Sequence, residues 1–389
     1  MLNRRHKRKL KKVLKYLVLG DVHLGHERNR TVDVIRNLDH YFGWYTDKSP
    51  FCQLDAIFIA GDLFDHLLNF SSTDVHEIQL WLSRLMRFCS RHNIVLRILE
   101  GTPSHDRKQS KVADVVYDLL KCELDFRYID TLHVEHIESL DLNVLYVPDE
   151  WTADTELTLT QAKELIKEAG LEQVDIAIMH GAFAYQLPMA PNTVPKHNEA
   201  EYLGLVERFI HIGHVHNFST FDRIIAEGSF DRLAHGEEEA KGAVVATLSP
   251  DGDSFDFIEN KEARIFKTIE LKSKDLEKSM AEIKKILAKI PENSFVRIKS
   301  TKDHPVYQAF DELKSFWPMY TFSKSTTEDD QDSYQLINNA VELDREFTPI
   351  HIHRDNIVSL LTQAVLSKHS LNPRQREILN NTLESTNAA

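Results

Sequence analysis

The sequence has few of the features that mark secreted and membrane proteins. Its 389 residues include three isolated cysteines, Cys52, Cys89 and Cys122, so it has neither a disulfide framework nor a Cys-x-x-Cys motif. No run approaches the roughly 20 apolar residues of a membrane span, and the N-terminus lacks the apolar core of a signal peptide. We therefore expect a soluble protein of a reducing, cytoplasmic compartment.

Basic residues are also scarce outside the first twelve positions. The chain has 47 Lys and Arg against 60 Asp and Glu, a formal net charge of −13. Seven of these bases lie in residues 1–12, so the remaining 377 residues carry 40 bases, 60 acids and a net charge of −20. The arm could be a solvated tail or could contact phosphate. The acidic body argues against a passive nucleic-acid coat protein, and a polyanionic substrate would need local metals, basic patches or a partner.

Short apolar runs alternate with helical patterns from residue 15 to about 250, which indicates an α/β fold. The later runs follow one another with little helix between them. This favours a mixed two-sheet sandwich flanked by helices over a purely parallel sheet. The expected strands are 15–19, 55–60, 94–99, 144–147, 174–179, 209–213, 224–225 and 243–246, and the expected helices lie near 31–45, 74–92 and 111–121.

The length suits two or three domains. The strand and helix pattern restarts after residue 264, which predicts a small α+β cap domain. The last segment has two short helical signals that cannot bury their own apolar faces, so they must dock on this chain or on a partner. The predicted organisation is a basic arm at 1–14, a main domain at 15–265, a cap at 266–323, an acidic linker at 324–349 and a helix pair at 350–389.

Five stretches place acids, imidazoles or small polar groups just after an apolar run. Mixed carboxylate and imidazole ligands suit divalent Mn, Fe or Zn, and the number of candidates implies two ions. A carboxylate can bridge two ions and an imidazole cannot, which makes Asp62 the natural bridge. The stretches are Gly20-Asp21-Val22-His23, Gly61-Asp62-Leu63-Phe64-Asp65, Gly101-Thr102-Pro103-Ser104-His105-Asp106, Met179-His180-Gly181 and Gly213-His214-Val215-His216.

Each motif alone has a simpler explanation. Asp21 and His23 could form an ordinary turn at a strand end, and Asp62 with Asp65 could cap a helix. His211 has the opposite strand parity to the two histidines that follow it, so we expect it to be structural. Four others are expected to be ordinary surface histidines rather than substrate contacts: His26, His66, His197 and His235.

Taken together, the five motifs resemble those of the calcineurin-like metallophosphoesterase family. The family pattern is D-x-H, G-D-x-x-D, G-N-H-D/E, a lone H and G-H-x-H, and the match spans residues 20–216. The resemblance implies hydrolysis of phosphate esters at a two-metal site. It assigns metal A to Asp21, His23, Asp62 and His216, and metal B to Asp62, Ser104, His180 and His214. It further implies that His105 is the general acid or stabilises the transition state, oriented by Asp106, and that Asp65 contacts the ligands rather than a metal ion.

One position departs from the family pattern. Ser104 stands where an asparagine would supply an amide oxygen, and a hydroxyl is a shorter and weaker donor. We therefore expect metal B to bind loosely, through a water, or only with substrate present.

The stretch after the last motif narrows the resemblance. Residues 224–232 read Ile-Ile-Ala-Glu-Gly-Ser-Phe-Asp-Arg, and 236–242 read Gly-Glu-Glu-Glu-Ala-Lys-Gly. They look like the corresponding part of DNA double-strand-break repair nuclease subunits of the SbcD type, where the consensus is close to P-G-S-x-x-R, an acidic run and K-G. Glu227 replaces the usual proline. The expected order of domains agrees with this family.

This resemblance implies a DNA nuclease that requires two divalent ions, with Mn²⁺ the first choice. It implies 3′ to 5′ exonuclease action on duplex ends, endonuclease action on single strands, a homodimer and an SbcC-type ABC ATPase partner. The location would be the host cytoplasm if a phage encodes the protein. Candidate phosphate contacts are Arg107, Lys108, Arg297 and Lys299. Two alternatives stay open: another phosphoesterase, either a phosphoprotein phosphatase or a cyclic-nucleotide phosphodiesterase, and a non-catalytic scaffold that keeps the fold.

Overall fold

The computed structural model describes residues 13–44, 49–149, 154–188 and 194–326. The chain divides into two compact units, with the boundary between residues 337 and 338, and all of the described residues belong to the first. Nearly all of the predicted basic arm and acidic linker, and the whole predicted C-terminal helix pair, lie outside the described residues. None of the described helices is long and apolar enough to cross a membrane.

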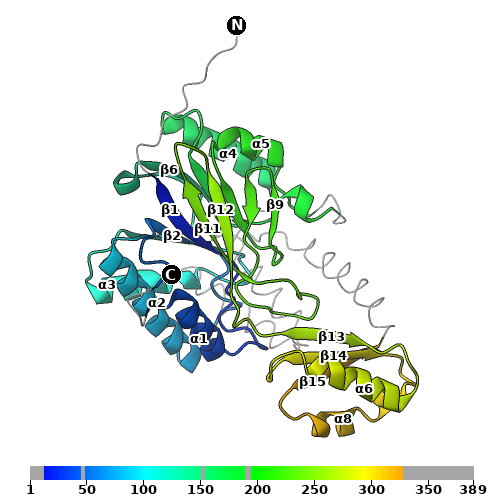
Figure 1. Ribbon diagram of the computed structural model, residues 1–389. Helices are drawn as coiled ribbons and strands as arrows, with labels where there is room; N and C mark the ends of the chain where they lie inside the picture. The colour runs from blue at the N-terminus through cyan, green and yellow to red at the C-terminus, as the bar shows by residue number, and fades with distance from the viewer. Residues whose placement is uncertain (1–12, 45–48, 150–153, 189–193, 327–389) are drawn as a thin grey trace, which may run out of the picture. The chain divides into compact units, whose positions relative to one another are not determined.

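Two six-stranded mixed sheets form the main domain (Figure 1). The first has the order β12-β11-β1-β2-β3-β4, and the second has the order β5-β6-β7-β8-β10-β9. The prediction of a mixed two-sheet fold is confirmed. The strands of the first sheet are β1 (Leu14–Leu19), β2 (Ala56–Ala60), β3 (Val95–Leu99), β4 (Phe126–Ile129), β11 (Gly242–Leu248) and β12 (Ser254–Glu259). Those of the second are β5 (His133–Ile137), β6 (Leu142–Val147), β7 (Ile176–His180), β8 (Ile210–Gly213), β9 (Ser219–Phe221) and β10 (Ile224–Ala226).

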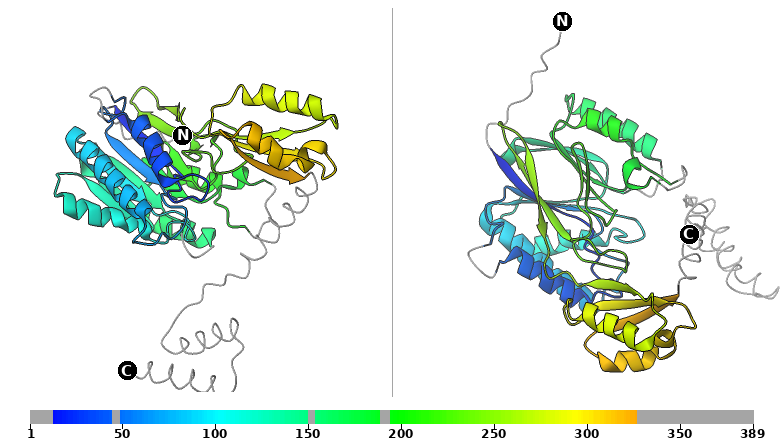
Figure 2. Two further views of the ribbon diagram at one scale, coloured as in Figure 1. Left: turned by 90° about the horizontal axis from the view of Figure 1, so that it is seen from below. Right: turned by 45° about the vertical axis from the view of Figure 1, so that its right-hand side comes forward.

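The inner strands of the first sheet, β1, β2, β3 and β11, are buried on both faces, which is why they read as largely apolar runs. Along β1, Tyr16 and Val18 face the second sheet, whereas Leu17 and Leu19 pack under the helices. Helices cover the outer face of each sheet (Figure 2). They are α1 (Thr31–Phe42), α2 (Thr73–His92) and α3 (Val112–Leu120) on the first sheet, and α4 (Thr155–Glu168) and α5 (Glu199–Leu205) on the second. Short 3₁₀ turns are η1 (Gln109–Lys111), η2 (Glu138–Leu140) and η3 (Ala184–Gln186).

The cap is a parallel three-stranded sheet with helices and its own apolar core. Its elements are β13 (Phe266–Glu270), α6 (Leu276–Leu287), β14 (Phe295–Ser300), α7 (Pro305–Gln308), α8 (Phe310–Phe316) and β15 (Thr321–Thr326). The strand β15 extends three residues into the predicted linker. It pairs with the whole of β14, and the Lys324 ammonium lies over the Tyr307 ring, so a polar stretch completes the sheet.

Candidate metal centre

The candidate ligands gather where parallel strands of the two sheets end. Asp21 and His23 follow β1, Asp62 follows β2, His180 ends β7, and the last two histidines follow β8. Within each of three groups, all the ligand atoms lie within 4.8 Å of one another. The groups are Asp21, His23 and His216; His23, Asp62 and His105; and Asp62, His180 and His214.

Asp62 belongs to two of these groups and lies between them. One carboxylate oxygen, Oδ2, is 2.8 Å from His105 Nδ1 and 3.7 Å from His23 Nε2, while Oδ1 is 3.3 Å from His180 Nε2. Burial alone would raise the pKa of Asp62, but the surrounding imidazoles hold it well below its usual range. The carboxylate is therefore ionised and faces both sides, as a bridging ligand must.

The backbone at these ligands adopts conformations that side chains rarely accept. The φ angles are 46° at Asp21, 51° at His23, 47° at Asp62 and 102° at His214. Such positive φ values cost on the order of 1–3 kcal/mol each and concentrate at functional sites. Gly61 is needed nearby because a Cβ there would overlap the His180 ring, and its own φ is 85°.

On the metal A side, the ligands are held by carboxylates behind them. His23 Nδ1 lies 3.2 Å from Asp65 Oδ1, and His216 Nδ1 lies 3.1 Å from Glu237 Oε1. Burial raises the pKa of Glu237, but the opposite effect of His216 and Lys241 is larger and brings the pKa down to about 2. Carboxylates in this position orient metal-binding imidazoles and make them more basic.

The metal A side also has an unsatisfied buried group. His23 is 1% exposed, and apart from the Asp65 contact of Nδ1, its Nε2 has no hydrogen-bond partner among the described residues. Such a group is costly unless something binds it. A divalent cation among Asp21, His23 and His216 fits this donor set.

Glu237 had not been singled out from the sequence, where only its place in an acidic run could have pointed to it.

On the metal B side, a backbone contact fixes the orientation of His180. Its Nδ1 donates to the carbonyl oxygen of Ala60 at 2.7 Å, which leaves Nε2 to face Asp62. Burial lowers the pKa of His180, but Asp62 raises it more, to about 10. The pKa of His214 falls to about 4 through burial and the neighbouring His180. Because the pKa of His180 is raised, a proton and a metal ion would compete for its Nε2.

The third motif places Thr102, rather than the predicted Ser104, beside the other candidate ligands. Ser104 is exposed. Thr102 instead places Oγ1 at 3.1 Å from both His180 Nε2 and His214 Nδ1, and at 3.2 Å from Asp62 Oδ2. The geometry therefore favours Thr102 over Ser104 as a donor on this side. The sequence held a signal for this, because Thr102 directly follows the motif glycine, as the family asparagine does, with two residues inserted after it.

His105 and Asp106 have separate surroundings. The His105 side chain is 34% exposed beside Asp62, so it can reach a substrate. The Asp106 carboxylate accepts hydrogen bonds from the amides of Phe64 and Gly101, both at 2.8 Å. These contacts tie the second and third motif loops together, whereas the resemblance implies that Asp106 orients His105. Burial, with Asp62 and Glu100 nearby, raises the pKa of Asp106 to about 8.

The four predicted phosphate contacts lie in two places. Arg107 and Lys108 follow the third motif, where Arg107 is exposed and the Lys108 ammonium lies 3.3 Å from Asp130. Arg297 and Lys299 lie on one face of β14, on the opposite side from the core residues of that strand.

His211 and His197 are buried as well. His211 lies 3.0 Å from the Tyr16 hydroxyl and 2.6 Å from Glu227, in keeping with a structural role. Glu227, at the usual proline position, is thus a buried partner of this histidine. His197, expected on the surface, is only 7% exposed and lies against Gly181, packed among aromatic rings. The prediction for His197 is therefore wrong, because a loop next to β7 folds inward.

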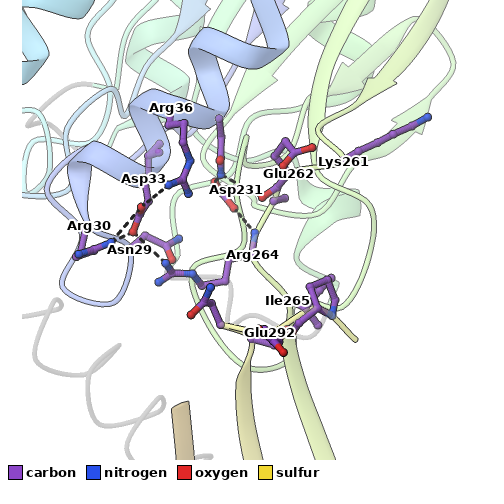
Figure 3. A pocket seen from close by; sticks show the side chains of 16 residues that line it. Asn29, Arg30, Asp33, Arg36, Asp231, Lys261, Glu262, Arg264, Ile265 and Glu292 are labelled. Carbon is purple, nitrogen blue, oxygen red and sulfur yellow. Dashed lines mark hydrogen bonds and ion pairs between the residues drawn. The ribbon is translucent and has the colours of Figure 1, made fainter. Parts of the chain in front are cut away.

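A separate polar cavity of about 320 Å³ lies beside the start of α1 (Figure 3). It shares no lining residue with the candidate metal centre. Asp33 is one of its lining residues and is paired with the guanidinium groups of Arg30, Arg36 and Arg264.

Comparisons with known proteins add little. No family model and no curated protein matches the chain. Two solved structures with some similarity are GAP50, described as the anchor in the inner membrane complex of Plasmodium, and TT1561 of Thermus thermophilus. GAP50 is 15% identical with a TM-score of 0.39, over 65% of this chain and 87% of that one. TT1561 is 11% identical with a TM-score of 0.35, over 63% and 99%. Likeness at this level says nothing about the site.

Proposed function

We propose that the protein is a two-metal phosphodiesterase of the calcineurin-like type that cleaves DNA. The observation that carries this is Asp62, an ionised carboxylate that lies between two sets of imidazoles and contacts both. Two divalent ions held there, Mn²⁺ by preference, would activate the attacking water and stabilise the charge on the phosphate. Asp21, His23 and His216 would hold one ion, and His180 and His214 the other.

The chain's own groups supply the remaining chemistry. Water attacks phosphorus, the bond from phosphorus to the leaving oxygen breaks, and that oxygen needs a proton. His105 shares a hydrogen bond with Asp62 through Nδ1, which leaves its second ring nitrogen to give that proton. Burial lowers the pKa of His105, but hydrogen bonding to Asp62 raises it above its ordinary value. This favours the protonated form that a general acid requires.

The choice of DNA as substrate is supported by the stretch between β10 and β11, which resembles the repair nucleases. Several of its groups lie against the metal A ligand His216. The amide of Ser229 and the ammonium of Lys241 both donate to the His216 carbonyl oxygen, at 3.1 and 2.8 Å. Glu237 holds the His216 ring. The stretch whose sequence resembles the repair nucleases therefore lies against a candidate metal ligand, which supports the proposal.

The proposed biological setting is double-strand-break repair or recombination. The activities would be 3′ to 5′ exonuclease on duplex ends and endonuclease on single strands. The protein would act as a homodimer with an SbcC-type ATPase, which the predicted C-terminal helix pair would bind. Co-expression with such a coiled-coil ATPase, followed by size-exclusion chromatography, tests this directly. Separate elution of the two proteins would count against it.

The test of activity compares substrates in Mn²⁺. Linear duplex, hairpin and circular single-stranded DNA should be cleaved, and a generic aryl phosphate ester should turn over slowly. His105→Ala should lower DNA cleavage about 10²-fold or more, the range for loss of a general acid. The control His136→Ala removes a histidine of β5 whose ring is 44% exposed, and should have no effect. Rapid hydrolysis of the aryl phosphate ester without any cleavage of DNA would contradict the nuclease assignment.

A further inference from the structure

The two sides of the candidate centre offer different charge to a cation. On the metal A side, Asp21 lies with His23 and His216, and Asp62 Oδ2 lies 3.7 Å from His23 Nε2. Among the described candidate ligands, the metal B side has one carboxylate, the shared Asp62, with His180 and His214. The imidazoles differ as well, because carboxylates support both histidines of side A, whereas a neutral carbonyl oxygen supports His180. Side A should therefore attract a divalent ion more strongly.

Thr102 is placed to complete side B. Its amide donates to Asp62 Oδ1 at 2.6 Å, which fixes the backbone beside the site. Its Oγ1 then lies within 3.2 Å of one ligand atom from each of three candidate ligands, Asp62, His180 and His214. A hydroxyl has one proton and can donate to only one of these neighbours. A cation where the four atoms converge could accept a lone pair from each of them.

We propose that Thr102 Oγ1 is the fourth donor to metal B, and that metal B is bound more weakly than metal A. This inference rests on the proposed function, because it presupposes two ions. A neutral hydroxyl is a weaker donor than a carboxylate, so side B lacks the second anionic oxygen that side A has. Ion A fills first, and the active two-metal form appears only at Mn²⁺ concentrations that fill site B.

The experiment is a Mn²⁺ titration of the full chain, with free Mn²⁺ measured by electron paramagnetic resonance. The wild type should show one tight and one weaker site, and the signal of a coupled Mn²⁺ pair should appear as the second fills. Thr102→Val removes the oxygen and keeps the branched shape. It should leave the tight site unchanged and weaken the second at least about tenfold. Thr102→Ser keeps a hydroxyl and should retain both sites.

Ser104→Ala is the matched control, since it removes the hydroxyl that the sequence had suggested, and it should change neither site. Circular dichroism checks that each variant is folded, and Thr102→Ala replaces the valine variant if that one is not. Two ions bound at wild-type affinity without the Thr102 oxygen would overturn the proposed ligand. Loss of the weak site in Ser104→Ala would also overturn it. A wild type that binds one ion or none would instead refute the two-metal function itself.

Discussion

Asp33 and Asp62 are two buried carboxylates of the described chain whose partners differ in kind. In the cavity beside α1, Asp33 is surrounded by three guanidinium groups at 2.8 to 3.2 Å. In the candidate metal centre, Asp62 contacts the imidazoles of His23, His105 and His180. Both carboxylates are nearly inaccessible to solvent, at 6% exposure for Asp33 and 1% for Asp62.

The difference separates a structural ion cluster from a metal site. A guanidinium is always charged and has no lone pair to give, so Asp33 is already neutralised and has no use for a cation. An imidazole is neutral when it offers a lone pair, so imidazoles around a carboxylate provide ligands without supplying permanent positive charge. Asp62 therefore lies in a set of donors that a divalent ion would complete.

Removing the bridging charge should give the largest effect. Asp62→Asn keeps the shape and can still accept from the Thr102 amide, but it takes away the carboxylate that contacts both groups. We expect loss of high-affinity Mn²⁺ binding and a fall in DNA cleavage of about 10³-fold or more. Asp33→Asn is the control, with Mn²⁺ binding unchanged. Equal Mn²⁺ stoichiometry in the two variants would remove the distinction between the regions.

Metal binding should also stabilise the fold. Ions that bind only the native state add about 4 kcal/mol to the free energy of unfolding at a thousandfold excess over the dissociation constant. Thermal unfolding should therefore shift upward with Mn²⁺ and return to its starting point with a chelator. Asp62→Asn should show no such shift, whereas Asp33→Asn should respond like the wild type. A Mn²⁺ shift that survives in Asp62→Asn would place the ions elsewhere.

The sequence predicted the buried strands of the two sheets better than the exposed ones. The candidate ligands follow strands that are buried on both faces, and such strands are recognisable as short apolar runs ending in glycine or acid. The edge strands β4, β5, β9 and β12 were not predicted because they are short or half-exposed. Polar and apolar residues are mixed along them, so they do not form apolar runs. Helix α4 was missed for a related reason, since only three of its fourteen residues are buried.

The third motif shows where spacing alone misleads. The family alignment counted back from His105 and reached Ser104, but the strand end fixes the backbone at Gly101. Position is set by the point where β3 stops, so Thr102 enters the site and the two extra residues move outward. The position of Thr102 directly after the motif glycine was a local signal, but its contacts with Asp62 and with two histidines more than 70 residues away appear only in the folded structure.

Asp231 lines the polar cavity, and its raised pKa should make the free energy of unfolding depend on pH. Burial raises its pKa from 3.8 to about 6, despite hydrogen bonds from Asn37 and the Arg264 amide. A raised folded-state pKa favours the protonated form, so its stabilising contribution is complete below pH 3.8. That contribution is lost as pH rises through 6, a change of roughly 3 kcal/mol. Between pH 4 and 7, the free energy of unfolding of Asp231→Asn, measured in urea, should therefore rise by about that much relative to the wild type. Parallel stability profiles for the two proteins would contradict the assignment.

The smallest effect should come from the arginines around Asp33, and it should leave metal binding untouched. Arg264 is 21% exposed, pairs with Asp33 at 3.0 Å and lies over the Phe295 ring. Arg264→Ala should lower the free energy of unfolding by about 2 kcal/mol, as for a charged hydrogen bond lost from a partly buried site. The matched variant Arg36→Ala removes a guanidinium that contacts the same carboxylate but is 71% exposed, and should cost less than about 0.5 kcal/mol. Urea unfolding and Mn²⁺ titration of both variants check this. Weaker Mn²⁺ binding in Arg264→Ala would show that the two regions are coupled, through the contact of Arg264 with the Arg28 carbonyl near the metal A loop.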